Sequence, residues 1–140
     1  MKTKLIILLL ASVVAITSVY SEPKKSDSDA LQGEWQGTEK DAAPDQHSTL
    51  TLTGKNLEFH GADTNEWYKG TFTLHEDTSP KQFIGVIRDC PSSDCVGMKV
   101  YAIYRIEKGA FTICGNQPGE TNCPAAFDAP GTRLIVFKRK

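Results

Sequence analysis

Apolar and polar residues alternate along most of the chain from Gly33 onward, and residues typical of turns separate the alternating segments. Alternation with a period of two is typical of β-strands that bury one face. In the stretch STLTLTGKNLEF, leucines alternate with threonines, GKN marks a turn, and alternation resumes with Leu57 and Phe59. The stretch YRIEKGAFTI repeats this arrangement around Lys108 and Gly109. Both stretches are therefore predicted to be hairpins.

The whole pattern predicts eight strands, and no segment keeps a helical period for more than two turns. Consecutive strands joined mostly by short links predict an all-β fold, an eight-stranded antiparallel up-and-down barrel, because closure removes exposed strand edges. A two-sheet β-sandwich is the alternative. The strands are expected at residues 34–40, 48–53, 56–60, 66–74, 81–89, 97–106, 110–115 and 132–139.

The connections between these strands fall into two groups, because alternate connections of a meander lie at opposite ends of the barrel. The short connections share one end, at residues 54–55, 75–80 and 107–109. The longer connections share the other end, at residues 41–47, 61–65, 90–96 and 116–131. Long loops on a rigid scaffold commonly carry binding sites. The sequence thus predicts a closed floor and a functional rim.

The stretch LQGEW, residues 31–35, is similar to the Gly-x-Trp signature of the lipocalin and calycin barrels. In those barrels the tryptophan packs at the closed end and an arginine near the last strand lies across it. The resemblance implies structural roles for Gly33 and Trp35, and for Arg139 or, failing that, Arg133. Stacking of arginine on a tryptophan face is favourable.

Residues 31–140 also resemble, more specifically, a bacterial family of exported lipocalin-like domains with an N-terminal LQGxW motif. The matching pieces occur in the order LQGEW, GTFTLHEDTSPKQFIGVI, YRIEKGAFTIC, QPG and LIVFKRK. The chain departs from the family pattern in the insert CPSSDC and in the segment NCPAAF. The family has no established activity, so the resemblance implies the fold and not a function.

The first 21 residues have the layout of a secretory signal peptide. Lys2 and Lys4 precede an apolar run over residues 5–16, and small residues continue to Ser21, after which cleavage is expected. The run is short for a membrane span, and a retained anchor is the alternative. We therefore expect a secreted or periplasmic protein. Residues 22–30 are predicted to be a polar, disordered tether and residues 31–140 one barrel domain.

The charge of the mature chain excludes one class of partner. Without Lys2 and Lys4, 14 basic side chains face 17 acidic ones, a net charge of −3. Nucleic-acid binding commonly leaves a basic footprint, which this balance does not provide. The expected partners are a small apolar ligand or another exported protein, with no nucleic acid and no membrane insertion of the mature chain.

Four cysteines, Cys90, Cys95, Cys114 and Cys123, lie in the mature chain. An even number in an exported domain predicts two disulfides, with three possible connectivities. Because CPSSDC and CGNQPGETNC each read as a polar loop bounded by cysteines, Cys90–Cys95 and Cys114–Cys123 are the favoured pairs. The same spacings are a poor match to zinc sites.

Catalytic chemistry has little support in the sequence. A nucleophile elbow, a phosphate-binding loop and a zinc-hydrolase helix are all missing. His47 and His60 are expected at the rim near Asp63, but histidines beside loops are more often simple surface residues than metal ligands. We predict no enzyme activity, no catalytic residue, no metal and no cofactor.

A barrel of this size is just wide enough to be filled by its own side chains or to hold one small ligand. We expect a binding protein that carries or sequesters a small apolar ligand at the open end. The alternative is a protein-interaction or inhibitor module on a filled barrel, using the long loop at residues 115–131, and the volume of any cavity separates the two. The candidate ligand-binding residues are Phe59, Trp67, Tyr68, Met98, Tyr101 and Phe127.

Overall fold

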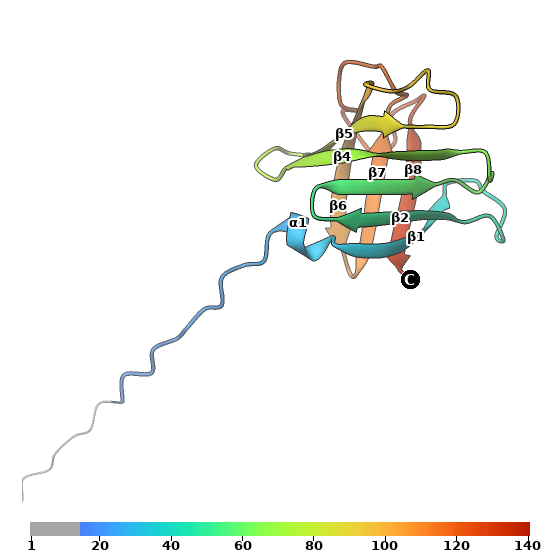
Figure 1. Cartoon of the computed structure of the whole chain (residues 1–140). Helices are drawn as coiled ribbons and strands as arrows, with labels where there is room; N and C mark the ends of the chain where they lie inside the picture. The colour runs from blue at the N-terminus through green and yellow to red at the C-terminus, as the bar shows by residue number, and fades with distance from the viewer. Residues whose placement is uncertain (1–14) are drawn as a thin grey trace, which may run out of the picture.

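The chain forms a closed barrel of eight antiparallel strands that follow one another in sequence order (Figure 1). The computed structural model describes residues 15–140, so most of the predicted signal peptide lies outside the described residues. The elements are α1 (Asp27–Ala30), β1 (Gly33–Glu39), β2 (Ser48–Thr53), β3 (Asn56–His60), β4 (Trp67–His75), β5 (Lys81–Asp89), β6 (Lys99–Glu107), β7 (Ala110–Gly115) and β8 (Arg133–Arg139).

Pairing between the first and last strands closes the barrel. β1 and β8 run antiparallel, with Trp35 opposite Arg139 and Glu39 opposite Ile135. This closure confirms the predicted up-and-down, lipocalin-like barrel over the sandwich. Each strand begins and ends within about two residues of its predicted limits, because the alternation of buried and exposed positions is regular in the structure as well.

Aromatic side chains fill the half of the barrel that is closed by short turns. Phe111 is at their centre, with ring centroids 5.7 Å from Trp35, 5.9 Å from both Tyr104 and Phe137, and 6.4 Å from Phe83. All five side chains are buried. Tilted and edge-on aromatic pairs at these separations add to the stabilisation from buried area. This half of the barrel is therefore filled by its own side chains.

The predicted tryptophan–arginine pair lies at the same end. The guanidinium carbon of Arg139 is 4.0 Å from the centroid of the Trp35 ring, and the indole Nε1 donates a hydrogen bond of 2.8 Å to the carbonyl of Leu31. Gly33 has φ +114°, and a Cβ there would lie 2.8 Å from Arg139 Nη1. Glycine is favoured at this position of LQGEW mainly because other residues rarely adopt this positive φ, and the close approach of Arg139 leaves little room for a side chain. Arg133, the alternative partner, lies at the other end.

A helical turn, α1, covers the closed end, and it is anchored by one buried carboxylate (Figure 1). Asp27 Oδ2 accepts hydrogen bonds of 2.7 Å from the Tyr104 hydroxyl and from Lys81 Nζ. The Asp27 backbone N–H donates to Glu76 Oε1 at 3.0 Å. Burial alone would raise the pKa of Asp27, but the hydrogen bonds from Lys81 and Tyr104, helped by nearby lysine charges, hold it below its ordinary value.

The predicted disordered tether is therefore wrong at its C-terminal part. Ser26 caps α1 by accepting a hydrogen bond from the backbone N–H of Asp29, and the chain then packs onto the barrel through Asp27. The ordered domain begins several residues before the predicted boundary at residue 31. Residues 15–25 are exposed and form no helix or strand.

One of the two predicted disulfides is present. Cys90 and Cys95 are bonded across the loop between β5 and β6. Cys114 and Cys123 are free thiols, so the prediction of a second bridge is wrong for this structure. Strand alternation places Cys114 on the outer face of β7, where it is fully buried and its thiol donates to the Ala126 carbonyl at 3.7 Å.

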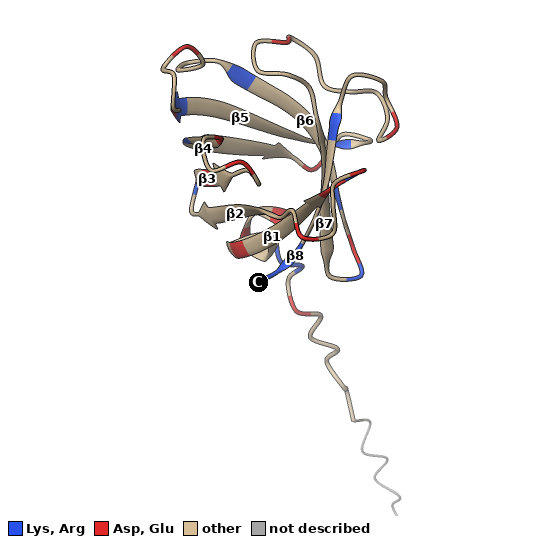
Figure 2. Cartoon of the chain, turned by 90° about the vertical axis from the view of Figure 1, so that its right-hand side faces the viewer, with Lys and Arg blue, Asp and Glu red and all other residues tan. Residues whose placement is uncertain are grey.

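Charged residues of both signs are spread over the strands and loops of the barrel (Figure 2). The chain's long connections join β1 to β2, β5 to β6 and β7 to β8, and they gather at the end opposite α1.

Among the described residues, no helix has the length and apolar character needed to cross a membrane.

Candidate ligand-binding site

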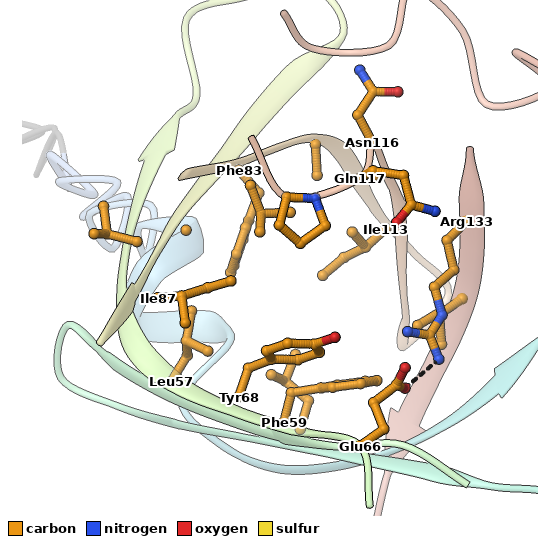
Figure 3. A pocket seen from close by; sticks show the side chains of 18 of the residues that line it. Leu57, Phe59, Glu66, Tyr68, Phe83, Ile87, Ile113, Asn116, Gln117 and Arg133 are labelled. Carbon is orange, nitrogen blue, oxygen red and sulfur yellow. Dashed lines mark hydrogen bonds and ion pairs between the residues drawn. The ribbon is translucent and has the colours of Figure 1, made fainter. Parts of the chain in front are cut away.

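A cavity of about 400 Å³ lies inside the barrel, in the half that opens toward the long loops. Strands β2 to β8 all contribute residues to its wall, and Asn116 and Gln117, which follow β7, lie at one edge of the cavity (Figure 3). Phe83 and Phe137 of the aromatic core form part of its lining. The interior is thus divided into a filled lower half and a hollow upper half.

Small residues on three neighbouring strands create this space. Gly85 of β5, Ala102 of β6 and Gly115 of β7 all line the cavity, and Ala102 is paired with Gly115. A Cβ built on Gly85 would lie 3.6 Å from the nearest atom, in the side chain of Leu57, which is an ordinary contact distance. The backbone therefore does not require glycine here, and the missing side chains leave volume that the opposite strands do not fill.

The opposite wall consists of two stacked aromatic rings. Phe59 of β3 and Tyr68 of β4 are direct partners across the two strands, with ring centroids 6.2 Å apart and an interplanar angle of 20°. The Tyr68 hydroxyl points into the cavity (Figure 3) and donates to no other described residue. Burial raises the pKa of Tyr68, and the charge of Glu66 adds to the shift, so the phenol is neutral at physiological pH.

An ion-pair cluster borders the mouth. Arg133 donates from Nε to Glu39 and from Nη2 to Glu66 Oε1, the latter at 2.7 Å. Its guanidinium carbon is 5.3 Å from the Phe59 ring centroid. Burial raises the pKa of Glu66, and the negative charge of Asp63 acts in the same direction. Burial lowers the pKa of Arg133, but a guanidinium stays charged in proteins.

Two of the six predicted ligand-binding residues, Phe59 and Tyr68, line this cavity. Trp67 does not, because it precedes Tyr68 in β4 and so faces outward, where Lys69 Nζ lies 5.7 Å from its ring centroid. Tyr101 is likewise on the outer face of β6, between two residues that line the cavity.

The other two predicted residues also lie outside the lining. Met98 precedes β6 and is 39% exposed. Phe127 is half-buried on the outside of the barrel, where the guanidinium carbon of Arg105 lies 4.4 Å from its ring centroid. The long loop between β7 and β8 thus folds partly over the outer face of β6 and does not hang over the mouth along its whole length.

Sequence reasoning missed the polar part of the site and the small residues that create the space. Arg133 could have been found from alternation, since Ile135 and Phe137 follow it at intervals of two and both face inward. Alternation also identifies Gly85 and Gly115 as inward-facing positions that lack a side chain. The pairing of Arg133 with Glu66 has no local signal, because the two are 67 residues apart.

The histidines near the rim do not assemble into a metal centre. His60 Nε2 lies 2.8 Å from Glu58 Oε1 on the outside of β3. Within residues 15–140, no group of three or more histidine, cysteine, aspartate or glutamate side chains is arranged to hold a metal ion.

Comparison of the chain with protein-family models, with curated proteins and with solved structures finds no match.

Proposed function

We propose that this chain is an exported lipocalin-like binding protein that carries or sequesters one small, mostly apolar molecule in the cavity at the open end of its barrel. The observation that supports this function best is the cavity itself. Its volume of about 400 Å³ falls within the roughly 300–1,000 Å³ typical of small-molecule sites. A mainly apolar wall with a few polar groups at one edge is the usual composition of such sites.

The rival function, a protein-interaction module on a filled barrel, fits the structure less well. That function requires a packed interior beneath an exposed Phe127, whereas the upper half of the barrel is hollow and Phe127 packs against Arg105. The proposal of export depends on the signal-like pattern of residues 1–21.

A fluorescence titration tests the proposed binding function. N-phenylnaphthylamine is a small, neutral, apolar probe whose emission rises when it leaves water. Added to the mature chain, residues 22–140, it should bind saturably with one probe per chain. The absence of a saturable signal at protein concentrations up to the solubility of the probe would contradict the proposal.

Two leucine substitutions locate the binding. Gly85→Leu places a side chain inside the cavity, and we expect it to weaken probe binding by at least about tenfold, the effect of ~1.4 kcal/mol. Thr73→Leu adds the same side chain to the exposed outer face of β4 and should leave the affinity unchanged. Circular dichroism and thermal unfolding would establish that both variants are folded. Equal affinity in all three proteins would place the probe outside the cavity.

A further inference from the structure

We infer that the cavity selects ligands whose polar end is neutral or positively charged and discriminates against carboxylates. This inference rests on the proposed function and specifies its ligand class. It comes from the charges that surround the mouth of the cavity, and in particular from the partners of Arg133.

Arg133 is the single positively charged residue in the described lining of the cavity. An unpaired arginine there would attract an anionic head group, since a guanidinium matches the geometry of a carboxylate. Arg133, however, already donates to two carboxylates, Glu39 through Nε and Glu66 through Nη2. With both acids ionised, this cluster has a net charge of −1.

A carboxylate ligand would have to compete with these two side chains. Displacing Glu66 or Glu39 from the guanidinium would leave a partly buried carboxylate without its partner, and that carboxylate would lose the compensation for its partial desolvation. Binding without displacement would place a third negative charge beside the first two. Both routes disfavour a fatty acid relative to an amine or an alcohol of the same length.

A second hollow next to the mouth also has more acidic than basic side chains in its lining. It has a volume of about 440 Å³ and shares Gln117 and Arg133 with the apolar cavity. Its lining adds Glu39, Asp41 and Asp128 but only one further cation, Lys40. The linings of the two hollows together carry four acidic and two basic side chains. A positively charged head group at the mouth would therefore enter a negative potential.

Groups that suit such a head are close by. Tyr68 is the member of the stacked aromatic pair nearer the centre of the cavity (Figure 3), and its hydroxyl makes no hydrogen bond to another described residue. An ammonium near an aromatic face and a carboxylate gains from both the ring quadrupole and the charge. The hydroxyl of an alcohol would find Tyr68 and the Gln117 amide as neutral partners.

Displacement of the bound probe by three ligands of equal length tests this selectivity. Decylamine, decanol and decanoate would be titrated at pH 7 against N-phenylnaphthylamine bound to residues 22–140. We expect decylamine to displace the probe at a concentration at least about tenfold lower than decanoate, with decanol between them. Decanoate binding as tightly as decylamine, or more tightly, would overturn the inference while leaving the proposed function intact. Failure of the probe itself to bind would contradict the proposed function, and the inference would fall with it.

A charge-removing variant assigns the selectivity to the cluster. Glu66→Gln keeps the size of the side chain but removes one negative charge, so the preference for decylamine over decanoate should narrow several-fold, with decanol little changed. Glu58→Gln removes a carboxylate on the outer side of β3 and is the matched control, with the wild-type preference expected. A preference unchanged by Glu66→Gln, or an equal loss for all three ligands, would contradict the assignment.

Discussion

Replacing Asp27 by asparagine tests whether α1 is fastened to the closed end by a charged side chain. The carboxylate holds together the hydroxyl of Tyr104, the ammonium of Lys81 and the first turn of α1. Asparagine keeps the size and one acceptor oxygen but removes the charge. The variant should therefore fold to the same barrel with lower stability.

The expected loss can be worked from the two contacts. A hydrogen bond to a charged group contributes roughly 1.5–3 kcal/mol and a neutral one about 0.5–1.5 kcal/mol, so the bond from Tyr104 weakens without disappearing. The Lys81 side chain is 38% exposed, and its pairing is worth only about 0–1 kcal/mol because solvent screens it. Together these effects give a loss of about 1–3 kcal/mol in the free energy of unfolding for Asp27→Asn.

The loss should also depend on pH, with a definite sign. The pKa of Asp27 in the folded chain is below its ordinary value of 3.8, because the hydrogen bonds from Lys81 and Tyr104 outweigh the opposing effect of burial. A group with a lowered pKa stabilises the fold fully above its unfolded pKa and ceases to do so as the pH falls through the folded value. The difference between Asp27→Asn and the wild type should be largest near neutral pH and shrink below about pH 4.

Urea unfolding followed by tryptophan fluorescence measures the free energy of unfolding of each variant at each pH. Trp35 is a suitable reporter because it is buried in the core that α1 covers. Asp29→Asn is the matched control, because Asp29 lies in the same helical turn but its side chain is exposed. We expect no more than about 0.5 kcal/mol for this control. Equal stability of the two variants, or a loss in Asp27→Asn that persists unchanged at pH 3, would refute the reasoning.

Three further substitutions and one titration test other parts of the structure. Gly70→Ala should abolish or severely reduce folding, as seen by circular dichroism, because a Cβ there would lie 1.9 Å from a backbone carbonyl of β5. Gly85→Ala, by contrast, should raise the free energy of unfolding by about 0.5–1 kcal/mol, since a Cβ at this position has room. Arg139→Ala should lower that free energy by about 1–2 kcal/mol in urea titrations through loss of its stacking on the tryptophan. Titration with Ellman's reagent in denaturant without reductant should find two thiols, from Cys114 and Cys123, and finding none would establish a second disulfide.

Alternation and turn residues were enough to predict the barrel, because both follow from the local geometry of a strand with one buried face. Counting chain reversals also predicted correctly that the long loops share one end, opposite the end closed by Trp35 and Arg139. These features depend on the order of residues along the chain and need no knowledge of distant contacts.

The parts that were missed depend on distant contacts. Residues 27–30 look like a polar tether because the partners that order Asp27 lie 54 and 77 residues away, at Lys81 and Tyr104. The cavity depends on Gly85 and Gly115 facing a large aromatic pair across the barrel, and strand alternation gives inward positions without saying which volumes meet. Cys114 shows the same limit. Strand alternation gives its outward position, but its burial beneath the long loop depends on how that loop folds.

Isoleucine methyl groups offer the most direct test of the claim that a small molecule binds inside the open half of the barrel. Ile87, Ile113 and Ile135 line the cavity, whereas Ile84 and Ile103 lie on the outer face of the same sheet. In NMR spectra of methyl-labelled residues 22–140, saturating N-phenylnaphthylamine should shift the three inner methyl signals strongly and leave the two outer ones in place. Shifts confined to the outer methyl groups, or no shift at any of them under saturating probe, would contradict the claim.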